Sequence, residues 1–176
     1  MLKPGRPAFA LALAVASTAL AQTTYPKIIP APGGHVVITN AAAQKAYDEI
    51  RFAPARRAGD FLHISGLVIA PYGAEGRDVD SFKAHTRRAF RFLDATLKAE
   101  GLTFADVVMI NTFHVWNAPG FKGTRDQQFE AFSAVKDEFM PPPHPAWTAV
   151  GTTELLGDNG VVEMQMIVYA PRPAAR

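Results

Sequence analysis

The sequence predicts one α+β domain in which two helices pack on one face of a mixed β-sheet. Apolar segments typical of strands are interspersed with two stretches of helical periodicity. Their order is β-β-α-β-α-β-β, which is typical neither of an alternating α/β fold nor of an all-β fold. Because both helices cover the same side of this sandwich, the other sheet face needs a cover, most simply through oligomerisation.

The first residues are typical of an export signal. Lys3 and Arg6 precede an uninterrupted apolar run, 8–16, that is too short to span a bilayer as a mature helix. An Ala-Leu-Ala motif at 19–21 has the small-x-small pattern of a signal-peptidase site. We therefore expect residues 1–21 to be a signal peptide and the protein to be periplasmic or secreted, with no membrane attachment after cleavage. A membrane anchor is the alternative, and the short run disfavours it.

Charge and cysteine content exclude several classes of function. Without Lys3 and Arg6, the 18 basic residues become 16, equal to the 16 acidic residues. A chain near neutrality lacks the basic surface expected of a nucleic-acid-binding protein. The sequence has no cysteine, which excludes disulfides, thiolate nucleophiles and cysteine-ligated metals. We therefore expect no nucleic-acid partner.

The chain after the signal divides into an N-terminal arm and the domain proper. The arm, 22–49, begins rich in proline and glycine and contains one strand-like piece at 36–39. The domain, 50–176, opens with two short strand-like segments separated by Ala58-Gly59, which predict a β-hairpin over 50–56 and 60–67.

A helix follows, capped by Asp78 or Asp80 and closed by Gly101. Its apolar residues recur at helical spacing, at Phe82, Ala89, Leu93 and Leu97. The opposite side carries a basic stripe that resembles a phosphate-binding surface, formed by Lys83, Arg87 and Arg91. We interpret this stripe as a solvated helix face.

The second half of the domain contains three strands and one helix. Residues 106–116 are apolar on both alternating faces, which indicates a central strand. The second helix, 124–139, is stopped by three prolines, and its buried stripe is predicted to comprise Phe129, Phe132, Val135 and Phe139. Strong turn residues at Asn159-Gly160 predict a closing hairpin between 145–156 and 161–170.

Residue chemistry alone does not identify a catalytic centre. The five histidines, at positions 35, 63, 85, 114 and 144, show no metal-ligand spacing, and those within strands are interpreted as structural. Ser65 lacks the context of a nucleophile elbow. Glu163 and Gln165 project from the same strand face, where polar groups either line a pocket or pair across strands.

A series of short motifs resembles the RidA/YjgF family. The motifs follow one another with the family's order and spacing over residues 50–170, and they are LHISG (62–66), AEGLTFADVV (99–108), FEAF (129–132), PAWTAV (145–150) and VEMQMI (162–167). The resemblance implies a chorismate-mutase-like fold, a homotrimer, and small-molecule sites in the clefts between subunits. It also supplies a cover for the open sheet face.

Deaminases of this family hydrolyse 2-imino or enamine acids without a metal or organic cofactor. The resemblance places their carboxylate-binding arginine at Trp147 and their water-positioning glutamate at Gln165. Tryptophan offers one N–H and no charge, so it cannot replace a bidentate ion pair. Glutamine orients water by hydrogen bonds and cannot take a proton. Ser65 keeps the family's serine, and Asp126 stands where asparagine is common.

The predicted ligand pocket therefore comprises Ser65, Asp126, His144, Trp147 and Gln165, with Ser65 and Gln165 as the candidates for catalysis. One interpretation is an exported protein that binds an aromatic or uncharged metabolite, with Trp147 as a stacking wall. A second is a hydrolase acting on another imine or enamine. The third comprises 2-imino acid deamination through a substitute for the arginine, or a purely structural trimer.

Overall fold

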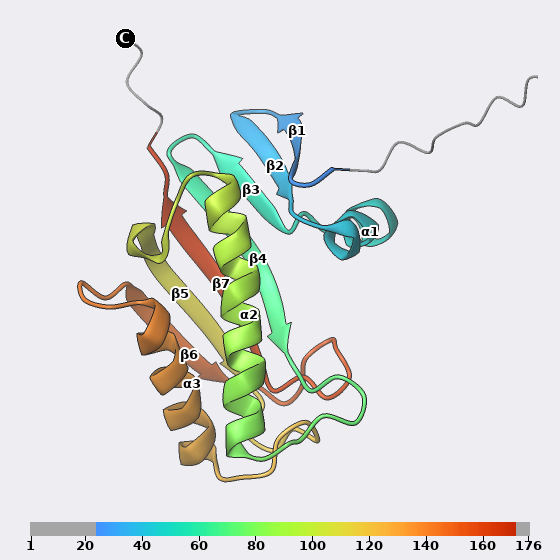
Figure 1. Cartoon of the computed structure of the whole chain (residues 1–176), viewed down its shortest axis with the longest axis vertical. Coiled ribbons are helices and arrows are strands. Elements are labelled where there is room, and N and C mark those ends of the chain that lie inside the picture. The colour runs from blue at the N-terminus through green and yellow to red at the C-terminus, as the bar shows by residue number, and fades with distance from the viewer. Residues whose placement is uncertain (1–23, 172–176) are drawn as a thin grey trace, which may run out of the picture.

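The computed structural model describes residues 24–171, and the expected signal peptide lies outside them. These residues form a seven-stranded mixed sheet and three α-helices (Figure 1), which confirms the α+β class. The strands are β1 (Lys27–Ala31), β2 (Gly34–Ile38), β3 (Ala55–Ala58), β4 (Phe61–Ile69), β5 (Val107–His114), β6 (Ala146–Gly151) and β7 (Val162–Tyr169). The helices are α1 (Ala41–Ile50), α2 (Val79–Ala99) and α3 (Arg125–Phe139), with a 3-10 turn at Phe104–Asp106. In the described part of the chain, no helix has the length and apolar character to cross a membrane.

The strands lie in the order β1-β2-β3-β4-β7-β5-β6. All neighbours are antiparallel except β5 and β6, which are parallel because α3 provides the crossover between them. The predicted first hairpin is confirmed as β3–β4, joined by Gly59-Asp60. Its first strand begins only at Ala55, because Ile50 ends α1.

Both long helices lie on one face of the sheet (Figure 1), as predicted. Asp78 caps α2 by accepting hydrogen bonds from the backbone N–H groups of Asp80 and Ser81, and Gly101 follows the helix with a φ of +70°. The predicted apolar stripe of α2 is buried against Met164, Met166 and other residues of β7 and β4. Of the basic stripe, Arg87 forms an ion pair with Glu138 of α3.

The closing hairpin predicted over 145–156 and 161–170 is wrong. Its turn exists, since Asn159 has a φ of +58° and the Gly160 N–H bonds to the carbonyl of Gly157. The two strands are nevertheless not neighbours, because β7 lies between β4 and β5 whereas β6 forms the far edge. Alternate residues of β7 are buried, and the central position gives β7 a pairing partner on each edge. Turn chemistry fixes only the local chain reversal.

The N-terminal arm contains more structure than the single strand-like piece predicted at 36–39. It supplies two strands, β1 and β2, that extend the sheet, followed by α1. The proline content that argued against a first strand is tolerated because β1 is an edge strand. Glu100, at the end of α2, ties this extension down: its carboxylate lies 2.7 Å from His35 Nε2 and 3.0 Å from Arg57 Nη1.

Candidate functional site

Gln165 belongs to a row of polar side chains on the sheet face that α2 and α3 do not cover. Met164 and Met166 are 0% and 2% exposed in the helix-side core, so the residue between them points the opposite way. Gln165 pairs in register with Asn111 of β5, which in turn pairs with Thr148 of β6. These three side chains form a polar row across an otherwise largely apolar face.

Glu163 is a functional candidate that the resemblance-based assignment missed. It lies on the same face as Gln165, and a Cβ built on Gly66 would come 1.8 Å from its Oε1 atom. The carboxylate therefore occupies the space above Gly66, where β4 is irregular between Ile64 and Leu67. A carboxylate thus remains on this face even though position 165 is glutamine. The available signals were the two-residue spacing and the side-chain-free glycine beside Ser65.

Trp147 lies on the other side of the sheet from Gln165. It pairs in register with Ile110, which is fully buried in the helix-side core. Its indole stacks on Phe129 of α3, with ring centroids 5.2 Å apart and planes 11° from parallel. Lys136 Nζ, also from α3, lies 5.3 Å from the indole centroid. Trp147 is therefore part of an aromatic layer between β6 and α3.

The one polar atom of the Trp147 side chain is already bound. Its Nε1–H donates to Thr112 Oγ1 at 2.9 Å. Thr112 is fully buried, and its hydroxyl also lies 2.9 Å from His114 Nε2. A ligand beside Trp147 would thus meet the π-face of the indole rather than a free N–H group.

His114 continues this hydrogen-bond chain into the core. The Gln128 side chain donates Nε2–H to the carbonyl of Val115, so its Oε1 must accept from His114 Nδ1–H at 3.1 Å. His114 Nε2 then accepts from the Thr112 hydroxyl at 2.9 Å, a closer partner than the Thr148 carbonyl at 3.5 Å. Burial lowers the pKa of His114 below its ordinary value, so the ring is neutral at pH 7.

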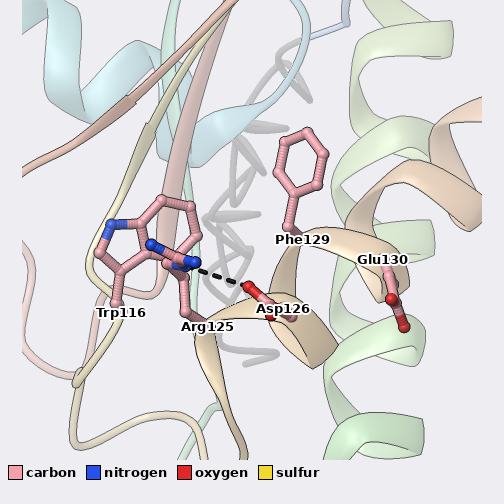
Figure 2. Close-up of a pocket in the computed structure, with 5 residues that line it drawn as sticks. All are labelled: Trp116, Arg125, Asp126, Phe129 and Glu130. Carbon is pink, nitrogen blue, oxygen red and sulfur yellow. Dashed lines mark hydrogen bonds and ion pairs between the residues drawn. The ribbon is translucent and has the colours of Figure 1, made fainter.

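A hollow of about 350 Å³ lies beside this aromatic layer, and we call it the aromatic pocket. Figure 2 shows Trp116 and Phe129 at opposite sides of it, with the ion pair of Arg125 and Asp126 between them. Trp116 stacks on His114 with centroids 4.7 Å apart. Phe129 is 37% exposed, so its predicted burial is wrong. It lies one turn into α3, over the edge strand β6, beyond which the sheet has no further strand.

The aromatic pocket carries more negative than positive charge. Arg125 Nε lies 3.1 Å from Asp126 Oδ1, so its charge is already paired, and Glu130 adds a second carboxylate. A ligand carboxylate would meet two like charges and one engaged guanidinium. The pocket therefore favours a flat ligand that is uncharged or cationic. Sequence reasoning missed Arg125, Trp116 and Glu130, since only the fold brings them together.

The structure does not gather the five predicted pocket residues into one site within a single chain. Asp126 lines the aromatic pocket, and Trp147 forms the layer beneath its Phe129 wall. Gln165 lies across the sheet, and His144 is exposed in the loop before β6. Ser65 lines a different cavity and donates its hydroxyl proton to the carbonyl of Ala53 at 2.7 Å. Among the residues from 24 to 171, no group of three or more His, Asp or Glu side chains is arranged to hold a metal ion.

Known proteins share this architecture. The family model described as Endoribonuclease L-PSP matches residues 42–170. The chain is 39% identical over 132 residues to RutC family protein YjgH of Escherichia coli (strain K12), covering 74% of this chain and 92% of that protein. A solved structure of protein YJGH has 36% identity and a TM-score of 0.56, over 72% of this chain and 89% of that one. A 2-iminobutanoate/2-iminopropanoate deaminase of Dermatophagoides farinae is 27% identical over 117 residues, covering 66% of this chain and 84% of that protein.

Two long helices on one face of a mixed sheet, with β7 between β4 and β5, define the chorismate-mutase-like fold class. Within that class, the chain belongs to the Endoribonuclease L-PSP family, also called the RidA/YjgF family. The resemblance drawn from the sequence motifs is thereby confirmed.

Proposed function

We propose that this chain is an exported RidA/YjgF-family protein that binds a small metabolite at the interfaces of a homotrimer and lacks 2-imino acid deaminase activity. Export to the periplasm or beyond rests on the signal-like residues 1–21. The remaining parts of the proposal rest on the residues around Trp147 and on the uncovered sheet face.

The observation that carries the proposal is the environment of Trp147. The resemblance places the substrate-gripping arginine at this position, where the structure has an indole stacked on Phe129 with its N–H bound to Thr112. No guanidinium can occupy that layer without displacing the indole. Loss of a bidentate carboxylate contact weakens substrate binding by about 2–5 kcal/mol.

The uncovered sheet face supports assembly. Phe61, Val150 and Tyr169 are 42%, 44% and 47% exposed in the single chain. Within the described residues, β6 pairs only with β5, so its outer edge is open. Association of subunits over this face would cover these side chains and bring the polar row of one subunit close to a neighbour.

The ligand chemistry follows from the aromatic pocket. Trp116 and Phe129 offer flat apolar surfaces, and the surrounding charges disfavour an anion. We therefore propose a small planar metabolite that is uncharged or cationic and stacks on these rings.

Nicotinamide and nicotinate provide matched probes, because they share one ring and differ in an amide or a carboxylate. We expect isothermal titration of the protein to give nicotinamide an affinity at least about fivefold higher, the effect of one repulsive charge at a partly exposed site. Phe129→Ala should abolish the binding, whereas Tyr72→Ala, at an exposed aromatic residue outside the pocket, should not. Equal or tighter nicotinate binding would contradict the proposed ligand class.

A second candidate function is hydrolysis of an uncharged imine or enamine, and Glu163 favours it. This carboxylate lies over Gly66 on the face that carries Gln165, so one group can take a proton while the other orients water. The distant deaminase relative is consistent with such chemistry. Turnover of a non-acidic imine that is lost in Glu163→Gln and retained in Gln165→Glu would favour this function. Absence of turnover would leave ligand binding as the function.

A further inference from the structure

A second cavity, of about 250 Å³, lies between α1, α2 and β4. Its wall is mainly apolar, and each of the three elements contributes two apolar side chains, namely Ala42 and Ala43, Phe92 and Leu93, and Ile64 and Leu67. It is on the helix side of β4, whereas Glu163 and the polar row lie on the other side. We call it the α1–α2 cavity. It is separate from the aromatic pocket and does not depend on the function proposed above.

The cavity exists because α1 packs incompletely. None of the residues of α1 is buried, and the side chains that it directs at the cavity are alanines. The helix is held mainly at its start, where Asn40 Oδ1 accepts the Ala43 N–H at 2.9 Å and Gln44 accepts from Lys27 Nζ. Protein interiors normally fill such space. A molecule in the cavity would supply the contacts that α1 lacks.

The mouth of the cavity carries an available positive charge. A shallow hollow outside it shares Thr39, Asn40 and Phe92 with the cavity and is also lined by Arg88 and Arg91. The Arg88 guanidinium is engaged, because it binds the Glu75 carboxylate at 2.7 Å and the Ala70 carbonyl at 2.9 Å.

Arg91 differs from Arg87 in the basic stripe of α2. No ion pair or side-chain hydrogen bond joins it to another described residue, whereas Arg87 is bound to Glu138. An exposed guanidinium beside an apolar cavity complements a ligand with an apolar body and an anionic end. The carboxylate of Glu75 is already bound to Arg88 and so does not compete for Arg91.

Two hydroxyl side chains of the cavity wall, one from β4 and one from α2, have their protons engaged within the protein. Ser65 directs its proton to the carbonyl of Ala53, and Thr96, 8% exposed, directs its own to the carbonyl of Phe92 at 3.4 Å. Neither residue carries a charge. The mainly apolar interior thus accepts an apolar group, and Arg91, the unpaired cation at the mouth, determines the sign of the charged end.

We propose that the α1–α2 cavity binds a small amphipathic monocarboxylate, with its ring or branched chain between α1 and α2 and its carboxylate at Arg91. The size fits, since an apolar cavity of about 150 Å³ holds a benzene molecule. The cavity has room for one ring and a short linker to the mouth. Binding would pack α1 against α2 and raise the stability of the N-terminal extension.

Phenylacetate and benzyl alcohol are suitable probes, because they share a ring and differ in charge. We expect calorimetry to show saturable binding of one phenylacetate per subunit below about 10 mM. Arg91→Gln should weaken phenylacetate binding about fivefold and leave benzyl alcohol binding unchanged. Lys83→Gln is the matched control, since it removes a charge two turns away on the same stripe and outside the cavity.

Two further variants test the location. Ala43→Leu fills the cavity with a residue of good helix propensity and should abolish binding of both probes. Ala42→Leu repeats the test if the first variant alters the circular dichroism spectrum. Phe129→Ala, in the aromatic pocket, should leave phenylacetate binding unchanged.

Several results would overturn the proposal. These are no phenylacetate binding at all, equal weakening by Arg91→Gln and Lys83→Gln, or unchanged binding in both folded cavity-filling variants. Loss of phenylacetate binding in Phe129→Ala would locate the ligand in the aromatic pocket instead. None of these results bears on deaminase activity, so the two proposals fail separately.

Discussion

Thr112 is the point at which the aromatic layer can be tested most directly. Thr112→Val keeps the side-chain shape and removes the hydroxyl that binds both Trp147 Nε1 and His114 Nε2, each at 2.9 Å. His114 is fully buried, so water cannot replace its lost hydrogen bond. Trp147 is half-buried, so water can replace its hydrogen bond only in part. A buried polar group left without a partner costs about 1–3 kcal/mol. We therefore expect the free energy of unfolding to fall by about 2–4 kcal/mol.

Thr86→Val is the matched control for this prediction. Thr86 is also fully buried, and its hydroxyl donates only to the carbonyl of Phe82 within its own helix. Removing that bond leaves no other side chain unpaired, so we expect a loss below about 1 kcal/mol. Urea unfolding followed by circular dichroism measures both values. Equal losses in the two variants would refute the hydrogen-bond chain from Trp147 to Gln128.

Three further predictions concern acid stability, the N-terminal extension and assembly. Burial lowers the pKa of His114 and His85 below their ordinary value of 6.5, so the unfolded state binds more protons than the folded state. The free energy of unfolding should therefore fall as the pH drops below about 6.5, and its dependence on pH should be weaker in His114→Gln. An unchanged pH dependence in this variant would exclude His114 as a source of the effect. Glu100→Gln should cost about 3 kcal/mol in urea unfolding, because it leaves the largely buried Arg57 guanidinium without a counter-charge. Glu138→Gln, in an exposed pair, should cost under 1 kcal/mol, and similar losses in the two variants would show that burial of the pair is unimportant. Analytical ultracentrifugation should give the mass of a trimer, and a monomer at micromolar concentration would exclude the interface site.

The sequence predicted where helices and strands lie along the chain more reliably than it predicted which strands lie side by side. Periodicity and caps located α2 and α3 to within a residue or two, because a helix is determined by local side-chain spacing and end groups. The order of the strands depends on which strand is paired along both of its edges. A turn signal such as Asn159-Gly160 carries no such information. For this reason the β6–β7 hairpin was wrong although its turn was correct.

The sequence allowed several residues of the candidate site to be selected, but not their positions relative to one another. Motif order identified the family and selected Trp147 and Gln165, yet alternation places them on opposite faces of the sheet. Glu163 was recognised as a polar strand residue, but its position over Gly66 depends on an irregular pairing of β4 with β7. Phe129 was assigned to the core because helical spacing does not show that α3 overhangs an edge strand.

We propose that Trp147 removes the family's 2-imino acid chemistry from this protein. Ammonia release from freshly generated 2-iminopropionate, with and without the protein, measures it directly. We predict no acceleration by the native protein, because an indole stands where a guanidinium would grip the substrate carboxylate and the nearby Lys136 is already paired with Asp137. Trp147→Arg is the companion variant, and any activity should appear only there. Ammonia release accelerated by the native protein would contradict the account.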